Sequence, residues 1–301
     1  MIVSNSWHSM NECQNVELTP PLFPSRRTMN TMSTANISAK DVMALRQKTG
    51  LGMMDCKKAL VEANGDIATA ETHLRAKLKG KMDERTDRAA GEGCIAVKYE
   101  GGKAAILEVR AETDFTARNE MFVAMANDVA GLSLVQPAGA ISFDEKMTEM
   151  LDNVRITTNE NFSFARGERV DGAGFGRYVH HDGKLGVLVV FDGEVPEDVA
   201  LGVAQHVAAH VPTPAAPDAD GLPAELVASK REEAEKEARD SGKPQEIAEK
   251  IAEGKMRKFF EEVTLLGQKY VRDDSMQVRD ILPKGVTVTS FHRMRVGEAG
   301  E

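Results

Sequence analysis

The sequence predicts an α+β protein with antiparallel sheets, and three observations carry this prediction. Three short helical patterns separated by glycine turns fill residues 37–80. Two pairs of apolar runs follow, each joined by a turn that is typical of a β-hairpin. A strongly charged helical stretch with a Gly-Lys-Pro interruption then precedes a final alternating strand. We therefore expect an N-terminal three-helix bundle, two related α+β core lobes and a projecting antiparallel helical hairpin.

The expected boundaries follow from these patterns and from shifts in composition. Residues 1–36 are rich in Asn, Ser, Thr and Pro and lack an apolar signal core, so we expect a disordered extension. Met29 or Met32 could begin the protein instead. The other boundaries are 37–80 for the bundle, 81–90 for a charged linker, 91–172 for core lobe 1, 173–296 for core lobe 2 with a helical hairpin insertion at 222–256, and 297–301 for a tail.

The overall composition limits the class of function. The chain of 301 residues has a formal net charge of -9, which argues against a nucleic-acid surface, because such surfaces cluster Lys and Arg. No apolar run approaches the length of a membrane span. The cysteines Cys13, Cys56 and Cys94 form no paired motif, so we expect no disulfide framework, no zinc site and a reducing, cytoplasmic location.

Capping signals define the helices of the bundle. Ser38 and Asp66 are expected N-caps of the first and third helices, and the pairs Thr49-Gly50 and Asn64-Gly65 end the first and second. A glycine loop, Leu51-Gly52-Met53, precedes the second helix. The pattern resembles a ubiquitin-associated-like three-helix fold, in which the glycine loop and adjoining apolar residues form a binding patch.

Each core lobe is expected to begin with a β-hairpin and continue into a helix. The first hairpin turns at Gly101-Gly102 and the second at Asp182-Gly183, and the second strands align Lys103 with Lys184. The segment 286–296 alternates like a strand and is expected to join the sheet of the second lobe. The helical hairpin at 222–256 is either a contact element or a solvated excursion without function.

The motifs of common enzymes are missing from the sequence. The run GAGFGR imitates a dinucleotide fingerprint, but a strand follows it where a helix should bind the pyrophosphate. His206 and His210 have the spacing of a zinc helix, yet Val207 stands where a metalloprotease needs its glutamate. We expect a packed histidine pair and leave a zinc hydrolase as a remote alternative. The sequence therefore predicts no enzyme, no cofactor and no metal site.

One aromatic residue stands at an unusual place. Phe115 lies in the stretch EVRAETDFTARNEMF, where a predicted strand turns into a helix. Such corners are usually polar because their backbone groups face water. The ring either staples onto Phe122 of the following helix or points toward another molecule. The residues alone leave both interpretations open.

Three stretches together resemble bacterial translation elongation factor Ts. They are ALRQKTGLGMMDCKKALVEANGD, TDFTARNE and SGKPQEIAEKIAEGKMRKFFEEVTLLGQKYV, and the resemblance covers roughly residues 37–296. It implies a guanine nucleotide exchange factor that promotes GDP release from elongation factor Tu, a GTPase, during protein synthesis. It implies no direct contact with nucleic acid or membrane, and it leaves the oligomeric state open.

The resemblance also assigns roles to individual residues. It implies that Asp114 and Phe115 enter the GTPase near its nucleotide and Mg²⁺ site, flanked by Thr113 and by Thr116, where the family usually has Val. The bundle is expected to touch the GTPase through Arg46, Met53 and Met54. The second hairpin is expected to touch it through His180. Met53 and Met54 could instead belong to the core of the bundle. The pair Thr158-Asn159 departs from the Ile-Gly of the family, which affects the contacts expected there. The alternative function is a protein-binding module with a ubiquitin-associated-like domain that does not exchange nucleotide.

Overall fold

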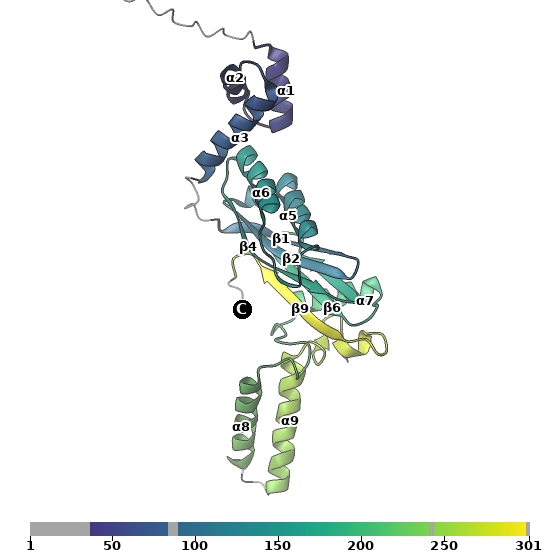
Figure 1. The fold of residues 1–301 in the computed structure, drawn as a ribbon. Helices are drawn as coiled ribbons and strands as arrows, with labels where there is room; N and C mark the ends of the chain where they lie inside the picture. Colours follow the sequence, from purple (N-terminus) through teal and green to yellow (C-terminus); the bar gives the residue numbers. More distant parts are fainter. Residues whose placement is uncertain (1–36, 84–89, 241, 243, 299–301) are drawn as a thin grey trace, which may run out of the picture.

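The computed structural model describes residues 37–83, 90–240, 242 and 244–298, and the expected N-terminal extension lies outside them. Figure 1 shows an elongated molecule with a helical bundle at one end, two stacked sheets in the middle and a helical hairpin at the other end. Antiparallel pairing joins all the strands that share a sheet. The architecture is α+β.

The bundle consists of α1 (Ala39–Thr49), α2 (Met53–Glu62) and α3 (Ile67–Asp83). The side chain of Ser38 accepts a hydrogen bond from the Asp41 N–H at 3.1 Å, and Asp66 caps α3 by accepting from the Thr69 N–H at 2.8 Å. Gly50 ends α1 with a φ of +70°, a conformation that favours glycine. α3 continues to Asp83 and so enters the segment expected as a linker, residues 81–90.

The first sheet has the strand order β1-β2-β4-β3. Its strands are β1 (Glu92–Glu100), β2 (Lys103–Ala111), β3 (Gly139–Ala140) and β4 (Phe162–Asp171). Three helices follow the hairpin of β1 and β2, namely α4 (Asp114–Ala117), α5 (Glu120–Ser133) and α6 (Glu145–Thr158). The core between α5, α6 and the sheet includes Phe122, which is fully buried and packs edge-on against Phe162 with 4.9 Å between ring centroids.

The second sheet has the order β5-β6-β9 and packs against the first. Its strands are β5 (Gly174–Val179), β6 (Leu185–Phe191) and β9 (Val288–Arg295), so the strand expected at 286–296 does pair with the second hairpin. Helix α7 (Glu197–Ala209) covers the outer face of this sheet. Side chains alternate on β6, because Val187 and Val189 face α7 while Leu188 faces the first sheet. The result is a four-layer stack of helices, sheet, sheet and helix.

A buried acid joins the two sheets. Glu108 on β2 is fully buried and accepts hydrogen bonds from Arg166 Nε at 2.9 Å and from the Gly297 N–H at 3.0 Å. It also forms an ion pair with Arg110 at 2.5 Å. Arg166 in turn donates to the carbonyl oxygen of Arg295 at the end of β9. These contacts tie the end of the second sheet to the middle of the first.

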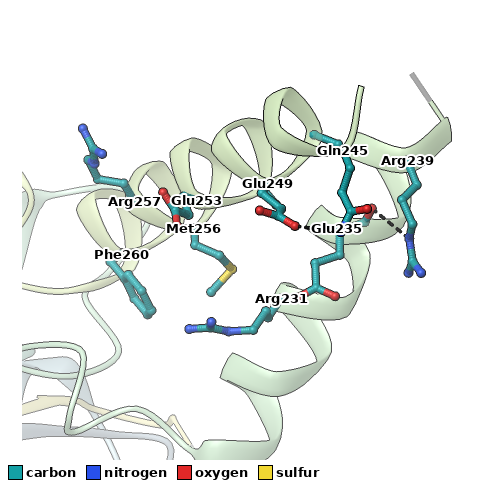
Figure 2. Close-up of a pocket in the computed structure, with 11 residues that line it drawn as sticks. Arg231, Glu235, Arg239, Gln245, Glu249, Glu253, Met256, Arg257 and Phe260 are labelled. Carbon is teal, nitrogen blue, oxygen red and sulfur yellow. Dashed lines mark hydrogen bonds between the residues drawn. The ribbon is translucent and has the colours of Figure 1, made fainter. Parts of the chain in front are cut away.

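The projecting hairpin consists of α8 (Ala224–Asp240) and α9 (Gln245–Val263). Four alanines, Ala234, Ala238, Ala248 and Ala252, bury their small side chains where the two helices approach each other. Toward the core the helices diverge around Met256, and Figure 2 shows Arg231 and Phe260 on either side of the gap. Both residues line a cleft with a volume of about 940 Å³. α9 runs to Val263, beyond the expected insertion boundary at 256.

A short segment that the sequence analysis did not assign closes the chain between α9 and β9. It contains the two-stranded hairpin of β7 (Lys269–Tyr270) and β8 (Asp273–Gln277) and the 3₁₀ helix η1 (Val278–Ile281). Tyr270 and Val278 pack into the core beneath α7. This segment therefore anchors the base of the helical hairpin to the second lobe.

Candidate functional site

The corner after β2 is a single helical turn, α4, that is held in place by contacts with the first sheet and with Glu160. Thr113 caps α4, since its hydroxyl oxygen accepts a hydrogen bond from the Thr116 N–H at 3.3 Å. The same hydroxyl donates to the Glu160 carboxylate, with 3.0 Å between Oγ1 and Oε1. Thr116 and Ala117 are buried against the first sheet. The turn is thus held by two of its own side chains and by a cap.

Phe115 points away from this anchored turn. Its side chain is 84% exposed, whereas Phe122 is fully buried against Phe162. The interpretation of Phe115 as a staple on the following helix is therefore wrong, because a stapled ring would be covered. Asp114 beside it is half-exposed and lies 3.8 Å from Arg118. An acid and an aromatic ring are thus presented together at the surface on a short, well-anchored turn.

The bundle presents an apolar patch around the start of α2. Met53 and Met54 are 46% and 64% exposed, so neither belongs to the bundle core. Arg46 on α1 is also exposed. Met43 is 43% exposed and was missed from the sequence, although its place three residues before Arg46 puts both on one face of α1. Thioether side chains of this kind adapt to irregular contact surfaces.

The bundle loop and the corner meet at the C-terminal end of α6. Gly50 lies against Thr157, whose Cγ2 atom is 3.2 Å from the place of a Cβ on that glycine. Glu160, three residues further on, accepts the hydrogen bond from Thr113. α6 thereby connects the loop before Met53 with the turn that carries Phe115.

His180 lies in the turn of the second hairpin, near the same end of the first sheet. Its Nδ1 atom is 3.1 Å from Asp182 Oδ1, and its side chain is 37% exposed. The carbonyl oxygen of Gly183 in this turn accepts a hydrogen bond from the Ile95 N–H at 2.8 Å. β1 starts at Glu92 opposite Ala111, two residues before Thr113. The candidate residues of the second hairpin and of the corner therefore adjoin the same strand end.

The departure at Thr158-Asn159 has a conformational basis. Asn159 follows the last residue of α6 with a φ of +59°, in the left-handed region where glycine is most common. Asn is the residue that replaces glycine there with the smallest strain. The Thr158 hydroxyl donates to the carbonyl oxygen of Val154 at 2.9 Å within the helix. Asn159 therefore provides the left-handed residue at which the chain leaves α6 toward Glu160.

The histidines of α7 serve the fold rather than a metal. The Val271 N–H donates to His206 Nδ1 at 3.1 Å, so the proton sits on Nε2, which donates to Gln268 Oε1 at 3.0 Å. Both ring nitrogens are thus used and neither has a lone pair for zinc. Among the residues that the structure describes, no group of three potential ligands is close enough to hold a metal ion. The zinc hydrolase alternative has no support.

Burial of His206 makes stability depend on pH. Burial lowers the pKa of His206 from its ordinary value of 6.5, with a further contribution from His210 and an opposing one from the bond to Gln268. The folded state therefore favours the neutral ring, and its stabilising effect is present above pH 6.5 and is lost as the pH falls below that value. Unfolding by urea at a series of pH values should show this loss. In His206→Gln the loss on acidification should be smaller, although the variant is less stable at about pH 8.

The exposed His73 on α3 offers a matched control for this measurement. His73→Gln should show the same loss of stability on acidification as the unchanged protein. An equal slope for His206→Gln and the unchanged protein would contradict the role given to His206.

Comparison with known proteins identifies the family of this chain. The family described as Elongation factor TS matches residues 112–298. Elongation factor Ts of Psychrobacter arcticus is 40% identical over 279 residues, which cover 90% of this chain and 94% of that protein. Elongation factor Ts of Francisella tularensis subsp. novicida is 40% identical over 278 residues, covering 89% and 94%. The chain is thus placed among the translation elongation factors. Within this class it belongs to the elongation factor Ts family.

Two further expectations concern the membrane and the thiols. No helix within the described ranges is both long and apolar enough to cross a bilayer. Cys56 and Cys94 are free and buried, and burial raises the pKa of the Cys94 thiol to about 12. A thiol in this state is a poor nucleophile, so Cys94 acts as a core residue.

Proposed function

We propose that this protein promotes the release of GDP from elongation factor Tu by inserting the Asp114-Phe115 corner near the nucleotide and Mg²⁺ site of that GTPase. The observation that carries the proposal is the 84% exposure of Phe115 on a turn whose neighbours, Thr116 and Ala117, are buried. A large ring held outward by a rigid support loses little conformational freedom when it enters a partner. Membership of the elongation factor Ts family supplies the identity of the partner.

In the proposed mechanism, a side chain of this protein displaces the groups around the Mg²⁺ and nucleotide site of the partner. Mg²⁺ requires near-octahedral geometry and binds nucleotide phosphates together with few protein ligands. A side chain that enters beside this site and shifts its surroundings weakens the binding of the metal and of the nucleotide together. Phe115 supplies the bulk, and the carboxylate of Asp114 brings a negative charge to the same place. No covalent step is needed.

Thermodynamic linkage then sets what the protein must do. The factor by which it weakens the binding of GDP equals the factor by which GDP weakens its own binding. It must therefore bind the nucleotide-free partner best, because differential affinity is the source of the shift. We place this activity in the bacterial cytoplasm, where the partner works.

Arg46, Met53, Met54 and His180 are proposed to hold the partner while the corner acts. Replacing Met53 and Met54 together with Ser should weaken binding by about 2 kcal/mol, or about thirtyfold in Kd, because apolar contact area is lost. Titration calorimetry with nucleotide-free elongation factor Tu measures this change. Val135→Ser removes an exposed apolar side chain from the loop after α5, outside the proposed surface, and is the control. Unchanged affinity in the double variant would remove the methionines from the proposed surface.

A fluorescent-GDP release assay with elongation factor Tu tests the function itself. Release should accelerate in proportion to the concentration of this protein until the partner is saturated. Binding without acceleration would favour the alternative, a protein-binding module with a ubiquitin-associated-like bundle. The exposed patch of Met43, Met53 and Met54 is the feature that supports this alternative.

A further inference from the structure

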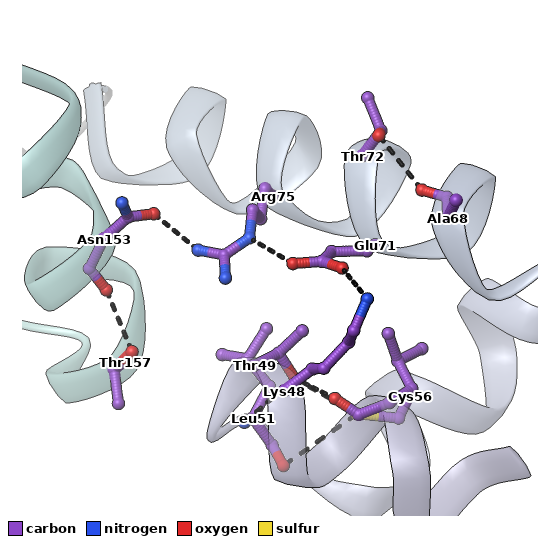
Figure 3. A network of polar contacts seen from close by, with 11 residues as sticks. Lys48, Thr49, Leu51, Cys56, Ala68, Glu71, Thr72, Arg75, Asn153 and Thr157 are labelled. Carbon is purple, nitrogen blue, oxygen red and sulfur yellow. Dashed lines mark hydrogen bonds and ion pairs between the residues drawn. The ribbon is translucent and has the colours of Figure 1, made fainter. Parts of the chain in front are cut away.

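Helix α6 contacts both parts of the proposed binding surface. One side of the helix packs against α3 of the bundle, and Glu160, two residues after the helix ends, accepts a hydrogen bond from Thr113. Figure 3 shows the first of these contacts, where Arg75 of α3 reaches Asn153 of α6 and Thr157 lies toward the loop around Leu51. α6 is thus the element that joins the bundle to the corner.

The contact with the bundle combines apolar packing with an ion pair between a half-exposed lysine and a buried carboxylate. Ile156 is 6% exposed and packs into the hydrophobic core of the bundle rather than into its own lobe. Lys79 Nζ lies 2.8 Å from Asp152 Oδ2, and Asp152 also accepts a hydrogen bond from Arg155 at 2.8 Å. The hydrogen bond from Lys79 to Asp152 raises the pKa of this lysine. Lys79 is 51% exposed and Asp152 is 8% exposed, so the pair adds a directed, charge-assisted contact beside the apolar packing of Ile156.

The contact with the corner is a relay of hydrogen bonds. Glu160 accepts the hydroxyl proton of Thr113, with 3.0 and 3.1 Å to its two oxygens. The lone pairs of the Thr113 hydroxyl are thereby directed toward the Thr116 N–H, which closes the turn. Glu112 adds a second connection by accepting from the Asn161 N–H at 3.0 Å. The direction in which Phe115 leaves the surface thus depends on the end of α6.

We infer that α6 and the turn after it form a positioning element, in which Asp152 and Ile156 of the helix fix the bundle and Glu160 of the turn fixes the Asp-Phe corner, so that both surfaces meet the partner as one rigid unit. This inference rests on the proposed function for its consequence but not for its geometry. Two contact surfaces held at a fixed spacing bind in one step, whereas loosely joined ones must be ordered separately. The three residues are positioning residues, since they act through the bundle and through Thr113.

A distance measurement tests the geometry without any partner. Spin labels on Lys58→Cys of α2 and Asp128→Cys of α5, with Cys13→Ser, report on the bundle and the core, because Cys56 and Cys94 are buried. We expect a narrow distance distribution in the otherwise unchanged protein. It should broaden in the junction variant Lys79→Met, Ile156→Ala, with circular dichroism preserved. A distribution that is equally wide in both proteins, whether narrow or broad, overturns the inference.

The matched control for the junction variant is Lys77→Met with Ile251→Ala. Lys77 is an exposed lysine two residues from Lys79, and Ile251 is a partly buried isoleucine in the distant helical hairpin. This control should keep the narrow distribution. Broadening in the control as well would show that the junction is not specific and would likewise overturn the inference.

Exchange kinetics separate the contact with the bundle from the contact with the corner. The junction variant should raise KM for the GTPase about tenfold with kcat kept, because the anchoring surface is misplaced. Glu160→Ala should lower kcat about ten- to hundredfold with less effect on KM, because the ring is aimed wrongly. Glu160→Gln keeps an acceptor for Thr113 and should restore most of kcat. If Glu160→Ala keeps its kcat while Phe115→Ala loses kcat, the inference is contradicted and the proposed function still stands. If the unchanged protein has no exchange activity, the proposed function is refuted. The spin-label distance distributions then still test the inference about α6.

Discussion

Replacing Phe115 with alanine is expected to slow GDP release from elongation factor Tu about thirtyfold at saturating exchange factor. Truncating an aromatic side chain at the centre of a contact costs about 2 kcal/mol or more, which corresponds to this factor in rate. The loss should fall on kcat, since the ring acts in the step that displaces the nucleotide. Stopped-flow measurement with fluorescent GDP gives the rate directly. The fold should be unaffected, because the ring is 84% exposed and surface changes alter the unfolding free energy by less than about 0.5 kcal/mol.

Val135 provides the control for this experiment. It is 83% exposed in the loop after α5 and lies in none of the surfaces assigned to the partner. Val135→Ala should exchange nucleotide at the same rate as the unchanged protein. If Phe115→Ala also retained the full rate, with an unchanged circular dichroism spectrum, the ring would not be the displacing group.

Replacing Glu108 with alanine should give the largest loss of stability among the substitutions considered. The change leaves Arg110 and Arg166 without their shared carboxylate and removes the acceptor of the Gly297 N–H. Breaking a buried ion pair from one side costs about 3–5 kcal/mol. Because both guanidinium groups remain 23% exposed, the lower end of that range, about 3 kcal/mol, is expected. Urea denaturation followed by circular dichroism measures this free energy.

Two other glutamate variants calibrate the result. Glu298 pairs with Arg293 at 3.1 Å but is 47% exposed, so Glu298→Ala should cost less than about 1 kcal/mol. Glu108→Gln keeps the shape and one acceptor and should fall between the two alanine variants. A loss for Glu108→Ala no larger than for Glu298→Ala would show that the buried contacts add little to stability.

Local signals in the sequence were sufficient to predict many of the elements. Ser38, Gly50 and Asp66 set helix ends because their side chains or their freedom of φ satisfy or terminate the helix where they stand. The Gly101-Gly102 and Asp182-Gly183 turns likewise define the two hairpins within a few residues. In each case the physical cause lies beside the residue in the chain.

Features that depend on distant partners were not predicted. β4 carries Arg166, Glu168 and Arg169, and its charges hide a strand that is defined by pairing with β2. Phe122 likewise packs against Phe162, a residue 40 positions further along the chain, while Phe115 is exposed. α6 had a helical pattern in Met147, Leu151 and Val154, but its contact with the bundle through Ile156 required the tertiary structure.

The place of β9 in the second sheet has a consequence for how the protein is made. β6 leaves the ribosome well before β9, because both helices of the hairpin and the segment after them come between the two strands. During synthesis the nascent second lobe therefore has one edge of β6 unpaired. Glu108 also lacks the hydrogen bond from the Gly297 N–H until that residue has been made. At ordinary elongation speeds this interval lasts on the order of ten seconds. The growing chain must be shielded from aggregation for that time, since the lobe becomes complete when its final strand arrives.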